Sequence, residues 1–162
     1  MSDRLLEKLP PDRWREEFEQ LGVGTLAELL EIAVDEIEPG RAVLTLELRP
    51  ELLLKTGFVH AGTVVALADT SAGYGCRASL PEHAGGFTTI ELKANLLASA
   101  TAADALRSEA TLVHAGRKTQ VWDAIVTRAR DRRVIGLFRC TQMLLAERPQ
   151  APPGAPPSPP AG

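Results

Sequence analysis

The sequence predicts an α+β domain in which a sheet of six antiparallel strands surrounds one long helix. The first observation is an apolar stretch over about residues 60–80 with almost no polar side, which is typical of a buried helix. The second is a set of short segments with alternating apolar and polar residues, separated by glycine and proline. The third is size, because 162 residues, 44% of them hydrophobic, suffice for one domain with a real core.

The first half of the chain is expected to form a helix, a hairpin and then the long helix. A helix should begin at Pro10-Pro11-Asp12, because apolar residues follow at helical spacing: Trp14, Phe18 and Leu21. Residues 29–38 alternate weakly and residues 41–48 alternate cleanly, with a Pro39-Gly40 turn between them. Residues 50–58 then lead into the long helix.

That helix is expected from about His60 to Leu80. Its intrinsic helix propensity is poor, since it holds three consecutive β-branched residues and three glycines. Burial within the sheet must therefore stabilise it.

Four strands are expected after the helix, over residues 87–97, 105–114, 118–130 and 134–145. The first of them should present one apolar face, made by Ile90, Leu92, Ala94 and Leu96. We divide the chain into a helical lead-in (1–28), the main domain (29–147) and a tail (148–162). The tail is rich in proline and predicted to be disordered.

Composition excludes several classes of function. A net charge of −3 argues against broad nucleic-acid binding. No apolar run reaches the ~18 residues of a membrane span, and the charged N-terminus does not read as a signal peptide. The two cysteines, Cys76 and Cys140, and the three histidines have no metal-ligand spacing. We therefore expect a cytoplasmic protein without a metal.

Asp69 is the most informative residue, because it lies in the middle of the apolar helix. A carboxylate placed there is costly unless it is paired or functional. His60 precedes it by nine residues. At ~100° and ~1.5 Å per residue, the two lie on opposite sides of the helix and ~13 Å apart along it.

The pattern H-A-G-x6-D-T-x2-G-Y, from His60 to Tyr74, resembles the hotdog-fold acyl-CoA thioesterases. The most similar branch is the phenylacetate-degradation and 4-hydroxybenzoyl-CoA thioesterase group. Residues 89–100 and 112–126 support the resemblance, which covers about residues 30–145. It implies a hotdog fold and hydrolysis of a short-chain, medium-chain or aryl acyl-CoA. Coenzyme A would be part of the substrate, with no separate cofactor, and the chain would form a homodimer that assembles into a homotetramer.

The resemblance also implies roles for individual residues. Asp69 maps to the family's helix carboxylate and would be general base or nucleophile. Ala61, with Gly62 beside it, maps to the backbone N–H that polarises the thioester carbonyl. Thr89 maps to a hydroxyl residue at the start of the next strand, and it either holds the attacking water or is a plain strand threonine. His60 either orients the carbonyl or the loop, or it only caps the helix or belongs to an interface.

One position departs from the family pattern. Many relatives carry an amide residue six positions before the histidine, and here that position is Leu54. Because His60 and Asp69 are far apart along one helix, we expect the site to be shared across a two-fold dimer.

Two basic clusters are candidates for the coenzyme A phosphates. The first is the turn with Gly116, Arg117 and Lys118. The second is formed by Arg128, Arg130, Arg132 and Arg133. Both clusters are also typical of solvated turns. Tyr74 and Phe58 are expected either to line the acyl pocket or to belong to the core.

Two alternatives to hydrolysis stay open. A hotdog module that binds acyl-CoA without cleaving it is favoured by Leu54 and disfavoured by Asp69. A dehydratase acting on hydroxyacyl thioesters fits the motif spacing less well than a thioesterase.

Overall fold

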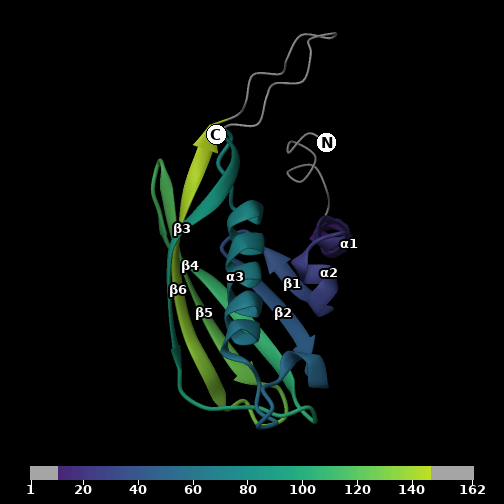
Figure 1. Cartoon of the computed structure of the whole chain (residues 1–162). Coiled ribbons are helices and arrows are strands. Elements are labelled where there is room, and N and C mark those ends of the chain that lie inside the picture. The colour runs from purple at the N-terminus through teal and green to yellow at the C-terminus, as the bar shows by residue number, and fades with distance from the viewer. Residues whose placement is uncertain (1–10, 147–162) are drawn as a thin grey trace, which may run out of the picture.

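The computed structural model describes residues 11–146, so the expected tail lies outside the described residues. The elements are α1 (Pro11–Gly22), α2 (Leu26–Leu30), β1 (Ala33–Glu38), β2 (Arg41–Glu47), a short 3-10 turn (Pro50–Leu52), α3 (Ala61–Ala78), β3 (Ala84–Leu96), β4 (Ala105–Ala115), β5 (Thr119–Arg128) and β6 (Val134–Ala146). The strands form one antiparallel sheet in the order β1-β2-β4-β5-β6-β3. The expected α+β hotdog architecture, with a six-stranded sheet and a long helix, is confirmed (Figure 1).

The helix α3 packs against one face of the sheet (Figure 1). Its buried residues recur every three or four positions: Thr63, Val64, Leu67, Ala68, Ser71, Ala72, Gly75 and Cys76. The other side, which includes Val65, Asp69 and Gly73, is only half-buried. The sheet therefore wraps one side of the helix, and the opposite side of α3 is left partly open in a single chain.

The start of the domain differs from the expected strand over residues 29–38. Leu29 and Leu30 end the short helix α2 instead, and the strand begins at Ala33. Thr25 caps α2, since its Oγ1 accepts a hydrogen bond from the N–H of Ala27 at 3.2 Å. The residues between Thr25 and Glu31 are good helix formers. Glu31 ends the helix with a left-handed φ of 60°.

The expected first helix is confirmed as α1, and it joins the core. Phe18 is fully buried, and its ring lies 5.1 Å from that of Tyr74 on α3. Tyr74 is thus half-buried and packs against the core beside Phe18. Burial raises the pKa of its hydroxyl, as expected for a phenol within a core.

A β-bulge in β3 changes the expected face of that strand. Thr89 pairs with Gln142 and Glu91 with Thr141, so Ile90 is an extra residue without a partner on β6. The bulge puts Thr89 and Leu92 on the same, helix-facing side although they are three positions apart. Ile90 therefore does not share a face with Leu92, as strict alternation had predicted, and it is 54% exposed.

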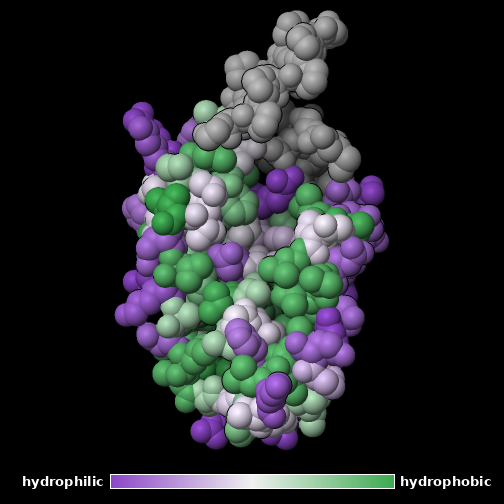
Figure 2. Space-filling model, viewed as in Figure 1, coloured by the Kyte–Doolittle hydropathy of each residue, from purple (hydrophilic) through white to green (hydrophobic). Residues whose placement is uncertain are grey.

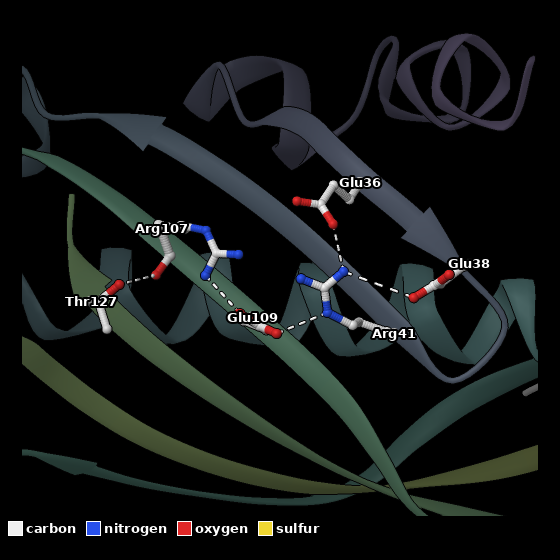
Figure 3. Close-up of polar contacts among 6 residues, drawn as sticks. All are labelled: Glu36, Glu38, Arg41, Arg107, Glu109 and Thr127. Carbon is white, nitrogen blue, oxygen red and sulfur yellow. Dashed lines mark hydrogen bonds and ion pairs between the residues drawn. The ribbon is translucent and has the colours of Figure 1, made fainter. Parts of the chain in front are cut away.

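The outer face of the sheet carries a charged network that links β1, β2 and β4 (Figure 3). Arg41 contacts Glu36 at 2.5 Å and Glu109 at 2.8 Å, and Arg107 contacts Glu109 at 2.8 Å. The two guanidinium groups lower the pKa of Glu109. These pairs connect neighbouring strands on the face away from α3, so they support the register of the sheet and lie outside the candidate site.

Candidate active site

The start of α3 is organised by His60. Its backbone is extended (φ −68°, ψ 137°), and its Nδ1 accepts a hydrogen bond from the N–H of Gly62 at 2.9 Å. The N–H of His60 donates to the carbonyl of Leu52 at 3.0 Å, and the N–H of Val59 to the carbonyl of Ala100 at 2.9 Å. His60 is therefore the N-cap of the helix. Because Nδ1 is an acceptor, the neutral ring carries its proton on Nε2.

This capping leaves one amide of the first turn free. The N–H of Gly62 is taken by His60, and the N–H of Thr63 donates to the carbonyl of His60 at 3.0 Å. The N–H of Ala61 makes no hydrogen bond with any residue of the described chain, and Ala61 is exposed. Free amides at a helix start attract negative charge. Of the two expected donors, Ala61 is thus the available one.

Asp69 lies in the middle of α3, half-buried, with its carboxylate turned toward β3. The Thr89 hydroxyl lies 3.4 Å from Asp69 Oδ1. Burial raises the pKa of Asp69 above its ordinary value, and the hydrogen bond from Thr89 lowers it to a smaller extent. Asp69 and Thr89, which the sequence analysis considered separately, are therefore in contact.

Gln142, on β6, completes this group and was missed by the sequence analysis. It is fully buried, and its Oε1 accepts a hydrogen bond from the Thr89 hydroxyl at 3.0 Å. Its Nε2 lies 3.3 Å from Cys140 Sγ. The available signal was a glutamine at an inward position of an apolar strand, where only a paired polar group is tolerated.

Within one chain the expected catalytic residues form two separate groups. His60, Ala61 and Gly62 lie at the start of α3, while Asp69 and Thr89 lie at its middle. Eight residues separate Ala61 from Asp69, which is ~12 Å along the helix axis. That distance is too long for both to contact one thioester group.

The turn with Gly116, Arg117 and Lys118 lies beyond the other end of α3. The carbonyl of Lys118 accepts a hydrogen bond from the N–H of Leu144 at 2.8 Å, and His83 Nε2 lies 3.0 Å from the carbonyl of Arg117. Within residues 11–146, neither Arg117 nor Lys118 forms an ion pair. Both cations are exposed and are available to an anion.

The second basic cluster lies at the helix-start end and is partly neutralised. Arg128 pairs with Asp131 at 2.6 Å, and Arg130 contacts Asp104 at 2.8 Å. A weaker hydrogen bond, at 3.4 Å, runs from Arg128 to the carbonyl of Ser99. These arginines therefore support the loops near the start of α3.

A tight turn presents two apolar side chains beside His60. The N–H of Leu54 donates to the carbonyl of Phe58 at 2.8 Å, and Gly57 adopts a left-handed φ of 82°. Leu54 is 47% exposed and Phe58 is 51% exposed. Phe58, unlike Tyr74, is thus free to contact an acyl group or another subunit.

Other features of the described chain point to no further chemistry at this site. A groove of about 680 Å³ lies on the outer face of the sheet, where Lys93, Arg107 and Arg139 line it, away from Asp69. Between residues 11 and 146, no three side chains of metal-binding type lie together. No helix in that range is long and apolar enough to cross a membrane.

Comparison with known proteins gives a consistent relationship. Residues 56–135 match the model of the thioesterase superfamily. The chain is 32% identical to a 1,4-dihydroxy-2-naphthoyl-CoA hydrolase of Listeria monocytogenes over 116 residues, which cover 72% of this chain and 92% of the relative. It is 27% identical over 113 residues to the acyl-coenzyme A thioesterase PaaI of Escherichia coli, covering 70% of this chain and 77% of that protein.

Solved structures agree on the fold. The crystal structure of S. sahachiroi AziG superimposes with a TM-score of 0.72 at 27% identity, covering 77% of this chain and 99% of that one. The E. coli PaaI structure gives a TM-score of 0.74 at 22% identity, covering 82% and 93%. The chain belongs to the hotdog acyl-CoA thioesterase group of the thioesterase superfamily, and it is a thioester hydrolase.

Proposed function

We propose that the substrate is a short-chain, medium-chain or aryl acyl-CoA, hydrolysed to the free acid and coenzyme A with Asp69 as general base. The observation that carries this proposal is the half-buried Asp69 carboxylate in contact with Thr89. Its pKa is raised by burial. A raised pKa makes a carboxylate a better proton acceptor near neutral pH, provided that it stays ionised.

In this mechanism Asp69 takes a proton from water while the water oxygen attacks the thioester carbon. The carbonyl oxygen becomes an oxyanion, which the free N–H of Ala61 stabilises. Collapse of this intermediate breaks the C–S bond, and the departing thiolate takes up the proton. The exposed Nε2–H of His60 supports the orientation of the carbonyl, while its Nδ1 holds the first turn in place.

We further propose a homodimer in which β3 pairs with β3 of a second copy. β3 is a thirteen-residue edge strand with one free side, and such edges are normally covered. Exposed apolar residues lie along it, including Ile90, Leu92 and Leu96. Apolar patches also lie on the face that carries α3 (Figure 2). A two-fold axis there brings Asp69 of one subunit toward Ala61 of the other.

A homotetramer is proposed as the next level of assembly. The outer face of the sheet exposes Ile125, Leu137 and Met143. Apolar residues on an otherwise charged face are suited to a contact between two dimers.

Both cysteines are buried free thiols, which fits the reducing cytoplasm expected from the sequence.

The relationship to one relative favours the aryl class of substrate, since that protein is a 1,4-dihydroxy-2-naphthoyl-CoA hydrolase and its substrate carries an aromatic acyl group. The exposed Phe58 beside His60 is a suitable contact for such a ring. For the phosphates of coenzyme A we propose Gly116, Arg117 and Lys118, because no carboxylate of the described chain neutralises these two cations.

The deciding experiment measures thiol release from short-chain, medium-chain and aryl acyl-CoAs by the wild type and by Asp69→Asn in parallel. We expect turnover by the wild type and a loss of at least about a hundredfold in the variant. The fold and the oligomeric mass should not change. Wild-type kcat in Asp69→Asn would exclude Asp69 as the base. A single turnover in H₂¹⁸O that labels Asp69 itself would instead assign it as the nucleophile.

A further inference from the structure

Beneath Asp69, a chain of polar contacts runs from α3 through β3 into β6. The Thr89 hydroxyl lies 3.4 Å from Asp69 Oδ1 and 3.0 Å from Gln142 Oε1. At the far end, Gln142 Nε2 lies 3.3 Å from Cys140 Sγ. Gln142 and Cys140 are both fully buried, so water does not replace either contact.

The geometry gives Thr89 more acceptors than it can satisfy. A hydroxyl group has one proton to donate, and here two oxygens compete for it. The shorter of the two contacts is the one to Gln142. The carboxylate of Asp69 is thereby left with a weakened hydrogen bond, although charged acceptors normally form the stronger ones.

We propose that Gln142 is a positioning residue of the reaction, which draws the Thr89 hydroxyl proton away from Asp69 and so leaves the carboxylate oxygen free to take a proton from water. This inference rests on the proposed role of Asp69 as general base. The contact with Cys140 orients the Gln142 amide with its oxygen toward Thr89. The β3 bulge at Ile90 is also needed, because it turns Thr89 toward the helix.

Few other groups titrate near this chain. Cys140 is coupled electrostatically to Asp69, but burial raises the pKa of its thiol to about 12, so it stays neutral in the assay range. Cys76, on α3, behaves in the same way, with a pKa of about 12. Glu91 and Asp123 act on Cys140 from the sheet. The shift of the Asp69 pKa comes from burial and from Thr89.

The test is the pH dependence of kcat/KM for the full chain, measured as thiol release from the best acyl-CoA of the panel. The acidic limb of this profile reports the pKa of the base. In Gln142→Met the Thr89 hydroxyl can donate its hydrogen bond only to Asp69, and this hydrogen bond favours the ionised form of the Asp69 carboxylate. We expect the acidic limb to move to lower pH by about half a unit to one unit. The value of kcat should fall severalfold, because the carboxylate becomes a weaker base.

Thr89→Val is expected to shift the acidic limb in the direction opposite to that of Gln142→Met. It removes the hydrogen bond to Asp69 altogether, so the acidic limb should move to higher pH. Thr89→Ser should restore the wild-type profile. A role of Gln142 in packing alone predicts a lower melting temperature without opposite shifts. If Gln142→Met and Thr89→Val shift the limb in the same direction, or neither shifts it, the proposal is overturned.

Gln120 offers a matched control. It is also a buried glutamine, and it lies directly opposite Gln142 on β5. Its bonds go to the carbonyl of Ser79 and to Trp122, both at 2.9 Å, and not to Thr89. Gln120→Met should lower stability and leave the limb in place; a shift like that of Gln142→Met would count against the proposal.

If Gln142→Met does not fold, Gln142→Asn serves as the second variant. It keeps a buried amide but withdraws the oxygen from Thr89, and the same downward shift is expected. An unchanged limb would overturn the inference. A wild type that releases no thiol from any acyl-CoA would instead refute the proposed function, so the two failures are distinguishable.

Discussion

At the scale of single residues, the proposed mechanism depends on which backbone amide is left free at the start of α3. His60 satisfies the N–H of Gly62 through its side chain and that of Thr63 through its carbonyl. Ala61 occupies the first position of the helix, where an N–H has no partner within the helix. The cap therefore leaves the N–H of Ala61 as the one available amide for the proposed oxyanion site.

This selection can be tested by Ala61→Pro. Proline is favoured at the first helical position, and it removes the N–H without breaking the helix. The extended backbone of His60 (φ −68°, ψ 137°) is the conformation that a residue before proline prefers. We expect kcat to fall by about 10²–10³, as for the loss of an oxyanion donor, while the melting temperature changes little.

The control is Ala61→Gly, which keeps the amide and should keep most of the activity. Full activity of Ala61→Pro would mean that another donor stabilises the oxyanion. A loss of helix by circular dichroism would mean that the fall in kcat reflects disruption of α3 and not the missing N–H.

Asp69 should also lower the stability of the enzyme at neutral pH. Burial raises its pKa in the folded state, so the folded protein binds a proton more tightly than the unfolded chain, whose ordinary value is 3.8. The stability associated with the protonated form is fully present below pH 3.8 and is lost as pH rises through the folded pKa. Asp69→Asn is therefore expected to melt at a higher temperature than the wild type at pH 7.5.

That gain should shrink as the pH falls through the raised pKa, because the wild-type carboxyl then takes up its proton. Melting temperatures of both proteins across pH 4–8 would measure it. An equal difference at every pH would show that the effect is not the titration of Asp69.

At the scale of elements, the position of α3 depends on a close approach to the sheet at Gly75. A Cβ atom there would lie 2.5 Å from Cζ3 and 2.7 Å from Cη2 of Trp122, whose ring is fully buried on β5. Neither the helix nor the indole can move without disturbing the core. Overpacking of this kind typically costs 1–3 kcal/mol.

We expect Gly75→Ala to be destabilised by about 2–3 kcal/mol in urea unfolding at fixed protein concentration. Gly73→Ala is the control on the same helix, because its Cβ would meet Phe87 at an ordinary 3.5 Å. It should stay within about 1 kcal/mol of the wild type, since alanine is the better helix former. Equal losses of stability in both variants would mean that the Trp122 side chain shifts to accommodate the new Cβ at little cost.

The elements also explain what the sequence could and could not predict. Periodicity located α3 and the four later strands, because burial on one face imposes regular spacing on long segments. It did not locate the bulge at Ile90, since one extra residue in a strand leaves no mark on composition. Nor did it locate Gln142, whose partner Thr89 is 53 residues away in the chain. Pairings over such distances depend on register.

At the scale of the whole molecule, the two halves of the candidate site belong together only if two chains combine. Ala61 and Asp69 are ~12 Å apart along one rigid helix. No side-chain motion closes that distance. In the proposed dimer, a two-fold axis beside β3 would run two α3 helices in opposite directions, so that each Asp69 would face the start of the other helix. Such a dimer would hold two equivalent sites, each built from both subunits.

Subunit complementation tests this arrangement directly. Asp69→Asn and Ala61→Pro should each be inactive, for different reasons. In a hybrid dimer, one site combines the intact Asp69 of the second variant with the intact Ala61 of the first, and the other site carries both defects. Co-expression with two different tags, followed by purification on both, isolates the hybrids. These should recover about half of the wild-type kcat per dimer, because one of two equivalent sites is intact.

Hybrids of two differently tagged Asp69→Asn chains are the control, and they should stay inactive under the same purification. An inactive mixed hybrid of confirmed dimeric mass would place Asp69 and its oxyanion donor in the same chain. That result would require α3 to bend or the donor to come from another loop. Recovered activity, in contrast, would mean that the free edge of β3 is a catalytic necessity, since a monomer would hold every site residue and still have no complete site.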